Sequence, residues 1–269
     1  SASMNIWHIA LLSVVQGLTE FLPISSSGHL ILLPALTNLP DQGLDMDLAV
    51  HIGTLMAVLV YYRRDVWNIG MACLPWAKAP DMVMRRLGIY IVLATIPAII
   101  FGYILHKIIP DGIRDFRIVA TTTIIFGLLM GLADKFGPRE KALHDMTLKS
   151  ALLIGLAQMV ALIPGTSRSG ITMTTARGLG FDRVDAARFS FLLSIPATAG
   201  AGMLGVIDVV KEGNVALGTD MAIAAVMTFF AGLAAISFMM QWLKRFGLMS
   251  FTVYRLLLGT ALVVFIVAR

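Results

Sequence analysis

Residues 16–29 read Gln-Gly-Leu-Thr-Glu-Phe-Leu-Pro-Ile-Ser-Ser-Ser-Gly-His, which places a carboxylate, a serine cluster and an imidazole in an otherwise apolar part of the chain. Residues 158–172 read Gln-Met-Val-Ala-Leu-Ile-Pro-Gly-Thr-Ser-Arg-Ser-Gly-Ile-Thr and repeat the order of glutamine, apolar run, proline, hydroxyls and glycine. When the two glutamines are aligned, Ser25 falls on Ser167. The chain therefore contains an internal repeat, and its two copies differ in their charged residues.

The composition indicates an integral membrane protein. Of the 269 residues, 58% are hydrophobic and only 14% are charged, whereas about 25% charged is usual in soluble domains. The net charge of +5 is explained by the Lys and Arg that cytoplasmic loops of membrane proteins carry, so no nucleic-acid partner is expected. The single cysteine, Cys73, excludes an internal disulfide. Residues 1–3 precede Met4 and are interpreted as a cloning remnant.

About 20 apolar residues are needed to cross a membrane as a helix. Six crossings are predicted, near residues 47–62, 87–109, 118–133, 188–210, 219–243 and 251–268.

Two further apolar runs behave differently from these crossings. Residues 6–22 and 148–163 end at a proline, and each is followed by serines, a glycine and a second short run at 30–38 or 171–180. Proline stops a helix, and hydroxyls favour a new helix start. The pattern predicts two re-entrant helix-turn-helix hairpins, whose broken backbone is buried in protein or lines a wet cavity.

The predicted fold is thus an all-α integral membrane protein with one domain, residues 4–269. Repeat one spans 4–133, a linker spans 134–147 and repeat two spans 148–269. Each repeat holds one hairpin followed by three crossings. Because three is odd, the second repeat enters from the opposite side, which gives an inverted-topology repeat whose hairpin tips meet near the membrane midplane.

The distribution of basic residues predicts the orientation. If each hairpin returns to its own side, most Lys and Arg fall on one face, which is then cytoplasmic. They are Arg63, Arg64, Lys78, Arg85, Arg86, Lys135, Arg139, Lys141, Lys149, Arg177, Arg183, Arg188, Lys244 and Arg245. Both termini and the mouth of the first hairpin are expected outside, and the second hairpin enters from the cytoplasm.

The first hairpin offers an acid beside hydroxyls and an imidazole. Gln16 and Glu20 lie four residues apart and share one helix face. A carboxylate at membrane depth costs at least ~2.5 kcal/mol, so it needs a partner or a function. A salt-bridged acid near the outer surface is the alternative. If a helix starts near Ser25, His29 is expected to reach the hydroxyl of Ser25 or Ser26.

The second hairpin offers an anion site. Arg168 stands between Ser167 and Ser169 at the predicted tip, where a guanidinium fork, hydroxyls and free amides of a helix start suit phosphate or carboxylate. The alternative is an arginine that pairs with Glu20 and locks the repeats together. Asp47 and His51 form another same-face pair, but helix capping or packing explains them equally well, and they are left out of the site.

Together the two tips are expected to support phosphoryl transfer. Ser26 is the candidate nucleophile, His29 the proton relay and Arg168 the group that stabilises charge on the phosphate oxygens. Glu20 acts as a base or holds a divalent cation. Gln16 and Glu20 offer hard oxygen ligands suited to Mg²⁺ or Ca²⁺, with substrate oxygens and water completing the shell.

At these residues the sequence resembles the undecaprenyl-pyrophosphate phosphatase family of the bacitracin-resistance type. The family's motif of Glu or Gln followed by Glu matches residues 16–20, and its Pro-Gly-x-Ser-Arg-Ser-x-x-Thr motif matches residues 164–172. The resemblance implies a membrane phosphatase that hydrolyses undecaprenyl diphosphate, a polyprenyl diphosphate lipid, to the monophosphate and inorganic phosphate. It further implies carrier-lipid recycling for the bacterial cell wall at the plasma membrane, dependence on a divalent metal, and bacitracin resistance.

Carried over by motif, the family's essential acid falls on Glu20, its proposed nucleophile on Ser26, its histidine on His29 and its phosphate-binding arginine on Arg168. Substrate binding is expected from Gln16, Ser25, Ser27, Ser167, Ser169 and Thr172. The competing hypothesis is a secondary transporter or lipid flippase, because inverted repeats are a transporter architecture. Transport does not require a clustered nucleophile and histidine beside the anion clamp. A homodimer is compatible with either function.

Overall fold

The computed structural model describes residues 5–26, 28–30, 33, 43–213 and 215–268. Within them the regular structure is helical, apart from an isolated β-bridge between Lys141 and Phe181. This confirms the all-α prediction. The elements are α1 (Ile6–Phe21), α3 (Gly43–Tyr61), α4 (Arg63–Cys73), α5 (Met82–Ile108), α6 (Phe116–Phe136), the 3₁₀ turn η1 (Leu143–Asp145), α7 (Leu148–Val160), α8 (Arg168–Gly178), α9 (Arg183–Glu212), α10 (Val215–Arg245) and α11 (Met249–Val267).

Five of the described helices, α5, α6, α9, α10 and α11, are long and apolar enough to cross a membrane. The chain is therefore a multi-pass membrane protein. The remaining crossing predicted at 47–62 corresponds to α3, whose apolar part is a shorter helix at Met46–Tyr61. α1 and α7, which correspond to the first runs of the two predicted hairpins, are also short apolar helices. The second run of the first hairpin, 30–38, lies largely outside the described residues.

Several helices begin before the apolar runs that predicted them, because aspartates cap them. The Asp81 carboxylate accepts hydrogen bonds from the backbone of the first turn of α5, and Asp182 caps α9 in the same way. Asp115 caps α6, where the backbone N–H of Arg117, with help from its side chain, holds the pKa of the Asp115 carboxyl below its usual value. Such caps satisfy N–H groups that the first turn leaves free.

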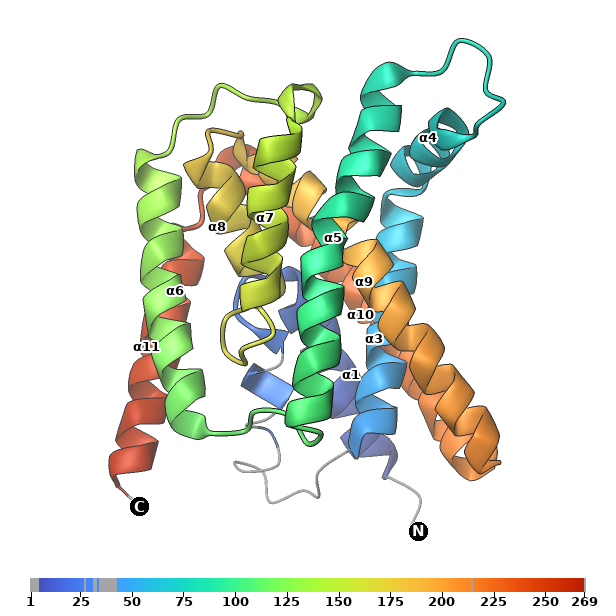
Figure 1. Ribbon diagram of the computed structural model, residues 1–269. Helices are drawn as coiled ribbons and strands as arrows, with labels where there is room; N and C mark the ends of the chain where they lie inside the picture. Colours follow the sequence, from blue (N-terminus) through green and yellow to red (C-terminus); the bar gives the residue numbers. More distant parts are fainter. Residues whose placement is uncertain (1–4, 27, 31–32, 34–42, 214, 269) are drawn as a thin grey trace.

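The first helices of the two predicted repeats start at opposite ends of the molecule (Figure 1). α1 begins at the end of the molecule where α11 finishes, and it runs toward the middle. α7 begins at the opposite end, and the turn that follows it also lies near the middle before α8 returns. α10 packs between α1 and α3, while α6 packs against α8 and α11. The ends of α1 and α7 are thereby brought toward the centre of the molecule.

The Asp134 carboxylate connects several helices at the end of the molecule where α7 begins. Asp134, at the end of α6, accepts hydrogen bonds from the side chains of Arg177 and Arg183 and from the backbone N–H of Leu248. The Arg177 side chain is fully buried. Arg177 and Arg183 were predicted as loop cations, but they form an internal ion-pair network that joins α6, α8, α9 and α11.

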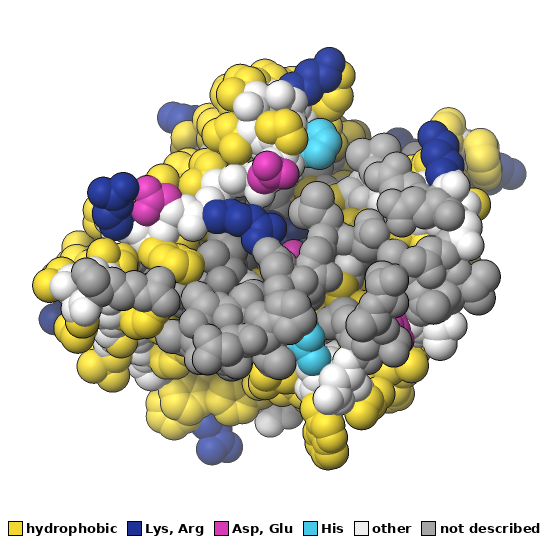
Figure 2. All heavy atoms as spheres, turned by 90° about the horizontal axis from the view of Figure 1, so that it is seen from below, with side chains coloured by type: hydrophobic (Ala, Val, Ile, Leu, Met, Phe, Trp, Pro, Cys, Tyr) yellow, Lys and Arg dark blue, Asp and Glu magenta, His cyan; other side chains and the backbone are white. Residues whose placement is uncertain are grey.

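The opposite end, where α1 begins, is seen in Figure 2. Apolar side chains form much of its perimeter, as expected for a surface that faces lipid. Basic and acidic side chains lie next to one another on part of this face. At the start of α6, Arg117 forms an ion pair with the capping residue Asp115.

Candidate functional site

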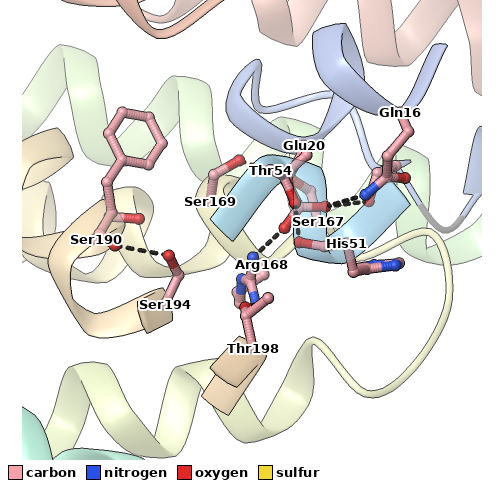
Figure 3. A network of polar contacts seen from close by, with 12 residues as sticks. Gln16, Glu20, His51, Thr54, Ser167, Arg168, Ser169, Ser190, Ser194 and Thr198 are labelled. Atoms are coloured by element: carbon pink, nitrogen blue, oxygen red, sulfur yellow. Dashed lines mark hydrogen bonds and ion pairs between the residues drawn. The ribbon is translucent and has the colours of Figure 1, made fainter. Parts of the chain in front are cut away.

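α1 presents Gln16 and Glu20 on one buried face, as predicted. The Nε2 atom of Gln16 donates a hydrogen bond of 3.2 Å to Oε2 of Glu20 (Figure 3). Both residues are buried, so the acid is not a surface residue. The carboxylate needs partners inside the protein, and they come from both hairpins.

The turn after α1 brings Ser26 to the Glu20 carboxylate. Ser25 adopts a positive φ of 74°, and its Oγ atom accepts a hydrogen bond of 3.0 Å from the backbone N–H of Gly28. This turn directs the next residue back toward α1. The Ser26 hydroxyl then donates a hydrogen bond of 2.7 Å to Oε2 of Glu20.

The second hairpin repeats this backbone geometry at the aligned serine. Ser167 has a φ of 71°, and its Oγ atom accepts a hydrogen bond of 3.0 Å from the backbone N–H of Gly170. A positive φ is uncommon for a residue with a side chain. Its occurrence at Ser25 and at Ser167, with the same capping contact, agrees with the alignment of the two motifs made from sequence.

Arg168 opens α8 and reaches across to the first hairpin. Its Nη2 atom forms an ion pair with Oε1 of Glu20, and its Nη1 atom donates a hydrogen bond of 2.9 Å to the Thr198 hydroxyl of α9. The side chains of Arg168 and Glu20 are 24% and 5% exposed. Ser26 and Arg168 therefore meet on the two oxygens of one carboxylate. The pairing that was considered as an alternative role for Arg168 is present.

The predicted substrate-binding hydroxyls have different surroundings in the structure. Ser169 lies between the hairpins, with its Oγ atom 3.3 Å from that of Ser167 and 3.5 Å from the carbonyl oxygen of Leu22. Thr172 is fully buried, donates to the carbonyl of Arg168 and contacts the Ser190 hydroxyl. Its contacts are those of a helix-packing residue. The contacts of Ser25 and Ser167 are helix caps, and Ser27 lies outside the described residues.

The expected contact of His29 with a serine hydroxyl is wrong. Its Nδ1 atom lies 2.7 Å from the backbone carbonyl oxygen of Ser25, and its Nε2 atom lies 2.8 Å from the Tyr254 hydroxyl. The carbonyl four residues earlier is an acceptor that every helical turn offers, so it competes with the side chains. The Ser26 hydroxyl turns to Glu20 instead.

Sequence reasoning missed several residues at the site. Thr198, a partner of Arg168, and Tyr254, the partner of His29, belong to α9 and α11 and carry no motif. Figure 3 shows His51 and Thr54 of α3 beside Glu20. The Nδ1 atom of His51 donates a hydrogen bond of 2.6 Å to the carbonyl of Asp47. Asp47 and His51 share one face of an apolar helix, and this pattern could have placed His51 at the site. It was explained by helix capping or packing instead.

A buried cation, Arg255 of α11, joins the hairpin tips. It is 0% exposed, and its donors contact five backbone carbonyls, those of Pro23, Thr122, Thr123, Gly165 and Thr166. These carbonyls belong to the turn of each hairpin and to α6. The sequence signal for Arg255 was an arginine inside an apolar run. No motif or helical spacing in the sequence predicts which residues such an arginine contacts.

The described residues contain no group of three or more His, Cys, Asp or Glu side chains that would hold a metal ion. The oxygen chemistry nearest to a cation site is at Gln16 and Glu20. The buried Oε1 atom of Gln16 has no hydrogen-bond partner among the described residues, whereas both Glu20 oxygens are engaged. Two coordinating side chains are too few for Mg²⁺ or Ca²⁺, so a bound phosphate compound would have to supply further oxygens.

Comparison with known proteins covers nearly the whole chain. A family model described as bacitracin resistance protein BacA matches residues 9–261, which include both hairpins. The chain is 48% identical over 261 residues to a protein named undecaprenyl-diphosphatase from Alcanivorax borkumensis, an alignment that covers 95% of this chain and 97% of that protein. Proteins of the same name from Erythrobacter litoralis and Ruegeria pomeroyi are 44% and 46% identical, and the alignments cover 97% and 96% of this chain and 100% and 98% of those proteins.

Proposed function

Because this chain belongs to the bacitracin resistance protein BacA family, we propose that it is a membrane phosphatase that hydrolyses undecaprenyl diphosphate to undecaprenyl phosphate and inorganic phosphate. The observation that carries this proposal is the meeting of Ser26 and Arg168 on the two oxygens of Glu20. A hydroxyl, a base and a guanidinium from two separate hairpins form the set of groups that phosphoryl transfer requires. The product returns to cell-wall synthesis as its carrier lipid.

Glu20 is the base in the proposed reaction, because the Ser26 hydroxyl already donates its proton toward that carboxylate at 2.7 Å. The Ser26 oxygen bonds to the terminal phosphorus atom while its proton passes to Glu20. The bond from this phosphorus to the bridging oxygen breaks, and undecaprenyl phosphate leaves with the electron pair. Water then attacks the phosphoserine, and Ser26 regains a proton from Glu20 as inorganic phosphate is released.

Arg168 supplies the charge stabilisation. Its fork contacts Glu20 and Thr198, so it is held in one orientation before the substrate arrives. Donors that are fixed in advance stabilise the developing charge without reorganising during the reaction. A planar guanidinium also matches two phosphate oxygens at once.

We also propose that Mg²⁺ or Ca²⁺ binds together with the diphosphate, with Gln16 Oε1 and Glu20 as its protein ligands. The buried Oε1 atom of Gln16, which has no hydrogen-bond partner in the described part of the chain, supports this assignment. Such a cation would neutralise charge on the diphosphate oxygens.

Phosphate release from undecaprenyl diphosphate by the purified protein in detergent tests the proposed function. The wild type is expected to be active, to lose activity in EDTA and to regain it when Mg²⁺ or Ca²⁺ is added. Ser26→Ala should lower turnover about 1000-fold or more, because the attacking oxygen is lost. Ser250→Ala, at an exposed position of α11, is the matched control and should retain full activity.

The outcomes of this assay separate the parts of the proposal. An inactive wild type, with and without the cations, would contradict the phosphatase. Near-normal turnover of Ser26→Ala would mean that water, activated by Glu20, is the nucleophile. Full activity in EDTA would remove the cation from the reaction.

We further propose an inverted-topology repeat with two re-entrant hairpins, whose active site opens to the outer side of the bacterial plasma membrane. The matching turns at Ser25 and Ser167 and the entry of α1 and α7 from opposite ends of the molecule (Figure 1) support this arrangement. The tips of the hairpins then meet near the midplane, where irregular backbone must be buried in protein.

Labelling of single cysteines in intact cells, in a Cys73→Ser background, tests the topology. Asn5→Cys and Arg114→Cys are expected to react with an impermeant reagent from outside. Glu140→Cys and Gly178→Cys should react only after permeabilisation; a side chain at Gly178 meets no neighbouring atom within 4 Å. Opposite labelling of positions 5 and 114 would show that the first hairpin crosses the membrane, and opposite labelling of 140 and 178 would show the same for the second.

A further inference from the structure

The two nitrogens of His29 have different partners, and this difference fixes the state of the ring. The carbonyl oxygen of Ser25, 2.7 Å from Nδ1, can only accept a hydrogen bond, so Nδ1 carries a proton. The Nε2 atom lies 2.8 Å from the Tyr254 hydroxyl, which can donate or accept. Nε2 is therefore the ring atom that gains or loses a proton, and Tyr254 stands at that atom.

Ser26 is not part of this pair. Its hydroxyl donates to Glu20, although Ser26 lies only three residues before His29. The site thus holds two separate hydrogen-bonded pairs, Ser26 with Glu20 and His29 with Tyr254. The second pair connects the first hairpin to α11 rather than to the carboxylate. Its tyrosine, Tyr254, is 41% exposed.

Two contacts hold Tyr254 in place independently of its hydroxyl. Its ring is stacked on the imidazole, with ring centroids 6.0 Å apart and an interplanar angle of 13°. The next residue, Arg255, fixes α11 against the turns of both hairpins through backbone carbonyls. Removing only the hydroxyl should therefore leave the helix and the ring where they are.

We propose that Tyr254 is a positioning residue of this site: its hydroxyl holds the Nε2 side of His29, the histidine that the sequence assigns to proton relay, and so fixes the orientation of that ring. When the ring is neutral, the Tyr254 hydroxyl donates to Nε2. When the ring is protonated, Nε2–H donates to the tyrosine oxygen, so the pair accommodates both states without a change of rotamer. This inference rests on the proposed phosphatase function.

Steady-state kinetics of Tyr254→Phe on undecaprenyl diphosphate tests the proposal. We expect kcat to fall about ten-fold, which is about the most that the loss of one net hydrogen bond supplies, while KM changes less than about two-fold. Tyr103→Phe is the matched control, because Tyr103 is an exposed tyrosine of α5, and it should behave as wild type. In a His29→Gln background, Tyr254→Phe should change kcat less than about two-fold, because the imidazole that the Tyr254 hydroxyl contacts is absent.

The second readout needs no activity. In NMR spectra of protein with ¹⁵N-labelled histidine rings, Tyr254→Phe should shift the Nε2 resonance that His29→Gln abolishes and leave the other histidines unchanged. An unshifted resonance, or a kcat of Tyr254→Phe within about two-fold of an active wild type, would overturn the proposal. An equal loss of kcat in both backgrounds would assign Tyr254 a role independent of His29. Failure of the phosphatase function itself would appear instead as an inactive wild type.

Discussion

Replacing Arg168 by lysine is expected to lower phosphate release at least about 1000-fold, the scale on which a guanidinium contributes to phosphoryl transfer. The arginine fork contacts Glu20 with one nitrogen and Thr198 with the other. An ammonium group is a point charge on a flexible stem and cannot keep both contacts. Lysine can still pair with Glu20, so the protein should fold, and the loss should appear in turnover.

The measurement is phosphate release in detergent, with the thermal midpoint recorded on the same sample. Arg117→Lys is the control, since Arg117 is exposed and its ion pair among the described residues is with Asp115 of its own helix cap; it should match wild type. If Arg168→Lys keeps a tenth or more of wild-type turnover, charge alone suffices, and the fork has no special part. A folded Arg168→Lys protein without activity is the expected result.

Replacing Arg255 by methionine is expected to destabilise the protein by at least about 3 kcal/mol, because each buried polar group left without a partner costs about 1–3 kcal/mol. Arg255 contacts five backbone carbonyls in a fully buried place. Methionine fills much of the volume but donates nothing. The thermal midpoint in detergent should fall by about 6 °C or more, at about 2–4 °C per kcal/mol for a protein of this size.

A lipid-facing position of the same helix gives the control for this change. Leu257→Met, at a residue that is 68% exposed, should leave the midpoint unchanged. Arg255→Lys should be intermediate, since lysine keeps the charge but cannot span carbonyls from both hairpins and α6. An unchanged midpoint for Arg255→Met would mean that the hairpin tips do not depend on this cation.

The pairing at the centre of the site was predictable from the sequence, because the internal repeat offers the partner that a buried carboxylate requires. The cost of a buried carboxylate demands a partner for Glu20, and Arg168 is the charged residue in the aligned motif of the other copy. The turns were predictable for the same reason, since Ser25 and Ser167 share one backbone geometry. The separation of these residues along the chain did not matter, because the repeat related them.

The periphery of the site was not predictable, because its partners carry no pattern. Tyr254 lies 225 residues from His29 and comes from a helix that reads as a plain membrane span. Thr198 is similarly one hydroxyl in an apolar helix. The prediction for His29 failed because helical spacing identifies which residues are near but not which atoms pair. The Nδ1 atom of His29 lies against the backbone carbonyl of Ser25, and the Ser26 hydroxyl donates to Glu20.

The ion pair between Glu20 and Arg168 also constrains the order in which the protein is assembled. The two residues are 148 positions apart, so at about 5–20 residues per second the ribosome needs on the order of ten seconds to add the arginine after the glutamate. During that interval the carboxylate must stay in water or take up a proton. The first hairpin therefore cannot reach its final buried arrangement before Arg168 of the second has been made.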